Sequence, residues 1–226
     1  MAGDSSTLGN LDARGESAML DLGANVECSA ENLVQFAVMG AAYIRLVEGI
    51  GAPTVGLLNI GSEELKGHGF IRQAAEQLRE ADLPQDFIGF VEGDDIAQGV
   101  ADVVVCDGFT GNIALKSIEG TAKFILDLLQ QAFRNTFLSK VGYLLARAGL
   151  RSLRSHIDPN HHNGGMMLGL NGLVVKSHGG ATGPGYASAI GVAIELSKGN
   201  LLERISADLA MIEHENDIAS RETATG

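Results

Sequence analysis

The possible folds of this chain are limited most by a short apolar segment that ends at a glycine turn and leads directly into a helical pattern. Residues 103–106 (Val-Val-Val-Cys) are followed by an Asp-Gly turn and then by apolar residues at helical spacing from Ile113 onward. The same order recurs after Val55–Ile60 and after Val174–Lys176. Strands that alternate with helices favour a parallel sheet with helices on both faces. The predicted fold class is therefore α/β, with a largely parallel sheet.

Glycine turns of this kind are also places where α/β proteins bind anions. The unpaired N–H groups of the first helical turn and the positive end of the helix dipole both point into the turn. If the three strands are parallel, their turns meet at one edge of the sheet. The candidate residues are Asn59 and Gly61 in the first turn, Asp107, Gly108, Gly111, Asn112 and Lys116 in the second, and Lys176, His178 and Gly179 in the third.

The composition excludes several classes of function. The chain has 226 residues, a formal net charge of −12, no tryptophan and only 5% aromatic residues. A nucleic-acid-binding protein would show a basic field and stacking side chains, so no nucleic-acid partner is expected. Two cysteines cannot form a disulfide framework and favour a reducing compartment. With no signal-peptide pattern and no membrane-spanning apolar run, the protein is predicted to be cytoplasmic.

We expect one α/β domain over residues 17–216. The polar stretch 1–16 precedes the first predicted strand at Ala18–Leu22 and is expected to be a disordered leader, and residues 217–226 are expected to form a frayed tail. Within the domain, Ser29 is a residue type that caps helix N-termini and predicts that the first helix begins directly after it.

A polar, glycine-rich link at 158–165 contains His161 and His162 but no paired cysteine. These histidines are interpreted as solvated loop residues, and no metal site is predicted. The next strand after the link is predicted at Leu173–Lys176. Cys106 ends an apolar strand and is interpreted as a core residue, not as a nucleophile.

The predicted helical protrusion at 119–157 differs from the rest of the chain in charge. No acidic residue occurs between Asp127 and Asp158. Three partners remain open for this basic, apolar face: a second subunit in a homodimer, an anionic membrane touched peripherally, or an acidic protein. The residues expected to form the face are Leu138, Lys140, Val141, Leu144, Leu145, Arg147 and Arg151.

Four motifs occur in the order known from one enzyme family. They are Asp21-Leu22-Gly23-Ala24-Asn25, Leu57-Leu58-Asn59-Ile60-Gly61-x-Glu63-x-x-Lys66-Gly67, Val103 to Lys116, and Leu168-Gly169-Leu170-Asn171-Gly172 with Lys176-Ser177-His178-Gly179. Over about residues 17–200 the chain resembles the phosphate acyltransferases of bacterial phospholipid synthesis, the PlsX family. The resemblance implies a fold like that of phosphate acetyltransferases and isopropylmalate dehydrogenases. It also implies that the sequence corresponds to the C-terminal two-thirds of the enzyme, without its N-terminal segment.

The resemblance implies transfer of a fatty acyl group from acyl carrier protein to inorganic phosphate, which gives acyl phosphate, with no cofactor. Phosphate is already a nucleophile, so the protein must hold this anion and stabilise the oxyanion that develops. Asn112, Lys176 and His178 are predicted to be catalytic, and His178 is the residue type that can protonate the leaving thiolate. Asn59, Lys116 and the glycine turns are predicted to bind substrate and phosphate.

Each of these residues also has a structural interpretation. Asn59 and Asn112 have side chains that cap turns, and Lys116 can be a solvated helix residue. Two other functions are candidates for the chain. A dinucleotide-dependent oxidoreductase would carry Gly-x-Gly-x-x-Gly after its first strand, and the turn at 21–25 lacks it. A truncated, inactive relative that docks on a membrane or a partner remains the alternative.

Overall fold

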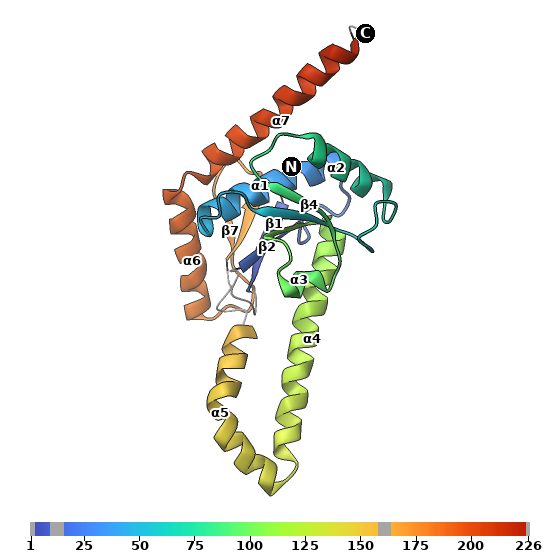
Figure 1. Cartoon of the computed structure of the whole chain (residues 1–226). Helices are drawn as coiled ribbons and strands as arrows, with labels where there is room; N and C mark the ends of the chain where they lie inside the picture. Colours follow the sequence, from blue (N-terminus) through green and yellow to red (C-terminus); the bar gives the residue numbers. More distant parts are fainter. Residues whose placement is uncertain (1–2, 10–15, 158–163, 225–226) are drawn as a thin grey trace.

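The computed structural model contains one seven-stranded sheet with helices on both faces (Figure 1). It describes residues 3–9, 16–157 and 164–224, with side chains for 17–151 and 164–212, and the statements below refer to these. The strands are β1 Gly3–Gly9, β2 Glu16–Leu20, β3 Thr54–Leu58, β4 Asp86–Val91, β5 Val103–Val105, β6 Gly165–Leu168 and β7 Val175–Lys176. The helices are α1 Ala30–Val47, α2 Gly69–Glu80, α3 Asp95–Gln98, α4 Gly108–Arg134, α5 Phe137–Ile157, α6 Gly183–Lys198 and α7 Leu201–Ala224.

The sheet has the order β4-β3-β5-β2-β1-β6-β7 and two parts that differ in strand direction. The first four strands in this order are mutually parallel. β1 is antiparallel to β2, β6 is antiparallel to β1, and β7 is antiparallel to β6. The predicted α/β fold with a parallel sheet is confirmed for the first part, and the second part adds three antiparallel pairings.

Alternating side chains of the parallel strands build a core on each face of the sheet. Ala18 and Leu20 of β2 pack, together with β3 and β5 residues, in the cluster that α1, α2, α6 and α7 cover. Met19 of β2 and Val104 of β5 point to the other face, which α3 and the first turns of α4 cover. Cys106 is buried in this second cluster, which confirms its assignment to the core.

The first helix begins where the sequence predicted. Ser29 is the N-cap of α1, and its side-chain oxygen accepts the N–H of Asn32 at 3.2 Å. The Asn32 side chain accepts the N–H of Ser29 at 3.0 Å in return, so two otherwise unpaired donors are satisfied. This capping box fixes the direction in which the chain leaves the β2 turn.

The structure differs from the sequence-based expectation at the ends of the chain and in the link. Part of the expected leader forms β1, which pairs with neighbours on both sides. β6 was not predicted, and α7 runs to Ala224 through most of the expected tail. β1 has the polar sequence Gly-Asp-Ser-Ser-Thr-Leu-Gly, and β6 has only four residues, so neither shows a strand periodicity. His161 and His162 lie outside the described residues.

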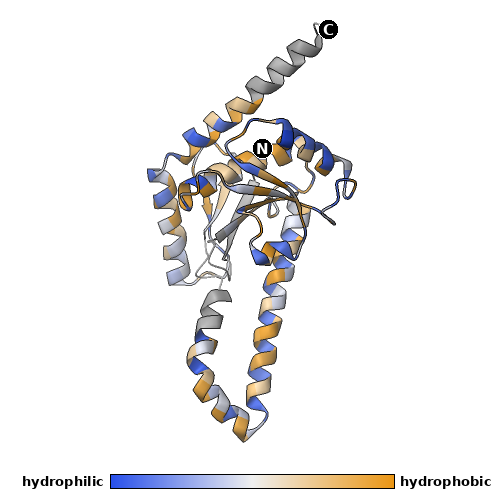
Figure 2. Cartoon of the chain, viewed as in Figure 1, coloured by the Kyte–Doolittle hydropathy of each residue, from blue (hydrophilic) through white to orange (hydrophobic). Residues whose placement is uncertain are grey.

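α4 and α5 form a hairpin that extends away from the sheet (Figure 1). Thr136 and Ser139 close the turn between these two helices. The Thr136 N–H donates to the Ser139 hydroxyl at 3.0 Å, and the Ser139 N–H donates to the Thr136 hydroxyl at 3.1 Å. The rings of Phe133 and Tyr143 pack across the hairpin with centroids 5.7 Å apart. Figure 2 shows apolar stretches along both helices. No described helix is long and apolar enough to cross a membrane.

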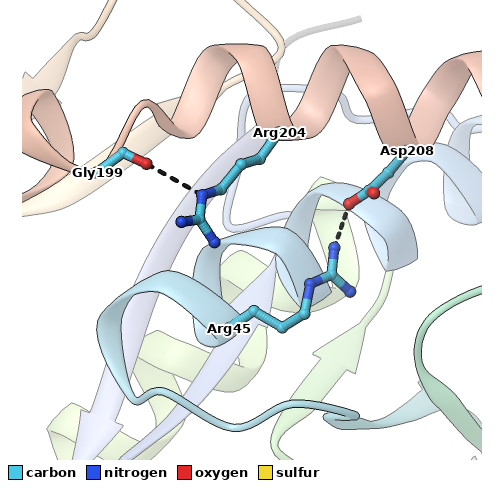
Figure 3. Close-up of polar contacts among 4 residues, drawn as sticks. All are labelled: Arg45, Gly199, Arg204 and Asp208. Carbon is cyan, nitrogen blue, oxygen red and sulfur yellow. Dashed lines mark hydrogen bonds and ion pairs between the residues drawn. The ribbon is translucent and has the colours of Figure 1, made fainter.

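An ion pair fastens the last helix to the first (Figure 3). Arg45 of α1 pairs with Asp208 of α7, and their side chains are only 15% and 12% exposed. At the start of α7, Arg204 donates from Nε to the carbonyl oxygen of Gly199 at 3.1 Å. α7 is therefore tied to the α/β core by a largely desolvated charge pair as well as by apolar packing.

Candidate active site

The turn after β2 is organised around one buried carboxylate. Asp21 accepts the N–H groups of Gly23 and Ala24 at 3.0 Å and that of Asn25 at 2.7 Å. The Asn25 side chain also donates to it at 2.8 Å. Four donors on one carboxylate hold this turn in a single conformation. In the sequence these residues stand out only as a motif, and no role in the site was predicted for Asp21.

The second turn, at the start of α4, lies against the first one. The N–H of Gly108 donates to the carbonyl oxygen of Asn25 at 2.8 Å. A Cβ atom on Gly108 would stand 2.6 Å from that same oxygen, and one on Gly111 would overlap the carbonyl oxygen of Asp21. Both glycines are therefore required by the close approach of two backbone segments.

The amides of this helix N-terminus already have partners within the chain. Asp107 caps α4 by accepting the N–H of Thr110 at 2.8 Å and its hydroxyl at 2.7 Å. The N–H of Gly111 donates to the Asp107 carbonyl at 2.9 Å. The N–H groups of Gly108 and Gly111 are thus already used within the chain, and Asp107 adds a negative charge beside them. Their role in binding phosphate stays a prediction.

Asn112 and Lys116 lie one turn apart on α4, at the same edge. A Cβ atom on Gly23 would be in ordinary contact with the Asn112 side chain, at 3.6 Å, so Asn112 lies beside the β2 turn. Lys116 extends into solvent and pairs with Glu119 at 2.9 Å. The exposed Asn112 amide is therefore next to the β2 turn. Lys116 is a solvated helix residue in this structure, as its structural interpretation predicted.

Asn59, after β3, is buried and acts on its own turn. Its Nδ2 donates to the carbonyl oxygen of Lys66 at 3.1 Å, and its Oδ1 has no hydrogen-bond partner in the described part of the chain. Gly61 is buried in the same turn, and a Cβ atom there would collide with the Glu63 carboxylate. Asn59 thus fastens the β3–α2 loop with one of its two amide N–H groups.

A pocket of about 370 Å³ opens between the β3 and β4 turns and α4. Its size falls within the roughly 300–1,000 Å³ range of small-molecule sites. Asn59 is the only predicted site residue that lines it. The full lining is Leu58, Asn59, Gly93, Ile96, Thr110, Ile113, Ala114, Ser117 and Ile118.

The structure separates Lys176, His178 and Gly179 from this edge. Three successive antiparallel pairings, from β2 through β1 and β6, leave β7 running opposite to β2. The carboxyl end of β7 is therefore at the opposite edge of the sheet. There, His178 Nδ1 accepts the N–H of Gly180 at 3.1 Å. The prediction that all three turns meet at one edge is wrong, because it assumed that β7 is parallel.

Two free thiols lie beside the joined turns. Cys106 donates to the Asp21 carbonyl at 3.5 Å, and Cys28 donates to the Asn25 carbonyl at 3.6 Å. Burial raises the pKa of the Cys106 thiol well above its ordinary value, and the nearby Asp107 and Asp21 carboxylates raise it further. Burial, more than these two carboxylates, also raises the pKa of Cys28. Neither thiol is in an environment that favours a thiolate nucleophile.

We expect a thiol reagent at neutral pH to leave Cys106 unmodified until the protein unfolds. Because the folded pKa is raised, the neutral thiol stabilises the fold fully below the ordinary thiol pKa of about 8.5, and this contribution is lost as the pH rises. Mass spectrometry after pulsed alkylation, with and without urea, measures the labelling. Rapid labelling of Cys106 in the native protein would show that the turns open readily.

Comparison with known proteins gives the family. Residues 10–204 match the sequence profile of a family described as fatty acid synthesis protein. The chain belongs to this family. Its similar relatives include a phosphate acyltransferase of Rhodospirillum centenum, 57% identical over 200 residues, which are 88% of this chain and 56% of the relative. The phosphate acyltransferase of Parvibaculum lavamentivorans is 57% identical over 197 residues, which are 87% of this chain and 55% of the relative. That of Erythrobacter litoralis is 56% identical over 193 residues, which are 85% of this chain and 54% of the relative.

Family membership confirms the resemblance inferred from the four motifs. The chain spans about half the length of the curated relatives it matches. The matched region of the family includes β2 to β7 and therefore both the joined turns and the pocket.

Proposed function

We propose that this chain carries an acyl-transfer site that moves a fatty acyl group from acyl carrier protein to inorganic phosphate and yields acyl phosphate for phospholipid synthesis. The observation that carries the proposal is its identity of 57% to a phosphate acyltransferase over 88% of its length. The alternative, an inactive docking protein, is supported only by the fact that the chain spans about half the length of its relatives. We place the reaction in the cytoplasm.

In the proposed reaction a phosphate oxygen attacks the thioester carbonyl carbon, and the C–S bond then breaks. The carrier leaves as a thiolate and takes up a proton, so no oxidant, reductant or enzyme-bound nucleophile is needed. The developing oxyanion needs a fixed donor, and the exposed amide of Asn112 beside the rigid β2 turn suits that role. Lys116, one helical turn away, supplies a positive charge for phosphate after leaving its solvent-exposed pair with Glu119.

Phosphate dependence tests the proposal. Purified protein is incubated with acylated carrier protein, and free carrier thiol is measured with and without phosphate. We expect release that rises with phosphate concentration and saturates. Release that is the same without phosphate would mean that the site is a thioesterase, and no release would favour the docking alternative.

Replacing Asn112 with Ala should lower turnover by at least about tenfold, as expected for the loss of a transition-state donor. The exposed Asn135, at the far end of α4, provides the matched Asn→Ala control and should leave turnover unchanged. Thermal midpoints of both variants show whether folding is affected. A His178→Ala variant belongs in the same series. If it loses as much turnover as Asn112→Ala, the loop after β7 belongs to the site.

We also propose that the hairpin is a peripheral membrane contact. Between 128 and 157 the chain has no acidic residue. Leu144 and Leu145 on α5 are 68% and 82% exposed, and Leu138 is 80% exposed. An exposed apolar face bordered by arginine and lysine fits the headgroup region of an anionic bilayer.

Liposome flotation should show binding that needs anionic lipid and weakens at high salt, because each basic side chain near the surface contributes about 1 kcal/mol. A Leu144→Ser, Leu145→Ser variant should lose most of this binding. The paired control is Ile190→Ser, Ile194→Ser on α6, where both side chains are about half exposed. Equal flotation of the double variant and the wild type would assign the α5 face to a protein interface.

A homodimer is the second proposal for the same hairpin. α4 has further exposed apolar side chains, including Phe124 (62%) and Leu128 (48%), beyond the residues of this helix that pack on the core. Sedimentation velocity over a range of protein concentrations measures the association. A monomer at every concentration would leave the membrane as the remaining proposed partner of these two helices.

A further inference from the structure

The pocket beside α4 follows one stripe of that helix. Thr110, Ile113, Ala114, Ser117 and Ile118 are spaced by three and four residues, so they share one face and lie in a line down the helix. From the first to the last of them the helix rises about 12 Å. The upper end of this stripe is at the sheet edge that also carries Asn112.

The lining of the pocket excludes a charged occupant. It contains no ionisable side chain, and its β3 and α3 walls are formed by Leu58 and Ile96. Its polar groups are few and neutral: the Thr110 hydroxyl donates to Asp107, one Asn59 amide N–H donates to Lys66, and Ser117 adds a hydroxyl. An anion here would meet no positive charge, so phosphate does not belong in this pocket.

Open apolar surface in the pocket needs a neutral, apolar occupant. Ile113 is 50% exposed, and Ile118 is half-buried against the core on the same helix face. Covering these side chains with methylene groups removes apolar surface from water. A narrow stripe about two helical turns long has the shape of a straight hydrocarbon chain.

We propose that this pocket holds the acyl chain of the thioester substrate, that Ser117 limits the preferred chain length and that Ile113 contacts chains of every length. The thioester end lies near Thr110, beside Asn112, and the methyl end runs along α4 toward Ile118. This inference rests on the proposed acyltransferase function. It adds the place of the acyl chain and the side chains that limit it.

A binding assay without phosphate tests the inference separately from turnover. The probes are straight-chain acyl N-acetylcysteamine thioesters from octanoyl to stearoyl, which are neutral, and calorimetry on the full chain measures their affinity. We expect affinity to rise about fourfold per methylene until the pocket is filled. Ser117→Phe, which fills the lower half, should abolish the gain for the longer chains, and Ile113→Ala should weaken all chain lengths.

The matched control is Ser206→Phe, at an exposed position on α7, which should behave as wild type. Ser117 and Ile113 are both exposed, and thermal midpoints verify that their variants fold. Wild-type affinity that does not depend on chain length, or identical chain-length profiles for Ser117→Phe and Ser206→Phe, would overturn the proposal. Either outcome would assign the pocket to contact with another protein surface. A profile shifted by Ser117→Phe in a protein with no phosphate-dependent turnover would support the pocket and reject the proposed reaction.

Discussion

Gly111→Ala should lower the free energy of unfolding by about 3 kcal/mol, the upper end of the usual cost of overpacking. The added Cβ would overlap the carbonyl oxygen of Asp21 and stand 2.8 Å from Cys106 Sγ. Neither neighbour can move freely, because the Asp21 carboxylate is held by four donors and Cys106 is buried. Urea denaturation followed by circular dichroism measures the change.

Gly120→Ala is the control for this substitution in the same helix. No atom lies within 4 Å of a Cβ placed there, so only the helix propensity changes. We expect a gain of up to about 1 kcal/mol in the free energy of unfolding. Similar effects at the two positions would show that the β2 turn and α4 are not in close contact at Gly111.

Asp208→Asn should cost about 3 kcal/mol of stability, because it leaves the charge of Arg45 without its partner in a largely desolvated place. Arg45 Nη1 is already buried without a hydrogen-bond partner among the described residues. The loss should appear as a lower urea midpoint and as faster proteolysis of α7, which the pair fastens to α1.

Two further variants separate charge from packing. Glu64→Gln breaks the exposed pair with Arg79, whose atoms are 3.6 Å apart, and should change stability by less than about 1 kcal/mol. The double change Arg45→Met, Asp208→Leu removes both charges and should recover most of the lost stability. If Asp208→Asn is as mild as Glu64→Gln, α7 is held by its apolar contacts alone.

The parallel part of the sheet was predictable because its signals are local. Three consecutive valines at 103–105 and the Ser29 cap are each legible within a few residues, and both were found where predicted. β1 and β6 have no such signal. They pair with each other across most of the chain, with Gly3 opposite Leu168, as well as with the strands next to them in the sequence. The direction of β7 depends on those two strands, and for this reason the position of His178 was not predictable.

The candidate site shows the same limit at the level of single hydrogen bonds. The sequence places glycines at Gly108 and Gly111, and a glycine turn at a helix N-terminus usually indicates free amides. Whether those amides are free depends on what packs against them, and here Asn25 and the Asp107 cap take them. The sequence shows only apolar residues at helical spacing along α4, and the pocket exists only because of how β3, α3 and α4 are arranged.

The length of α4 has a consequence for where the reaction takes place. One continuous helix of 27 residues begins at the edge that carries Asn112 and ends near the hairpin tip, a span of about 40 Å. If the tip touches the bilayer as proposed, the helix keeps the acyl-transfer edge well above the lipid headgroups. The acyl chain would then be handed over in water under cover of protein, and the amphiphilic product would have to travel down to the membrane before its next use.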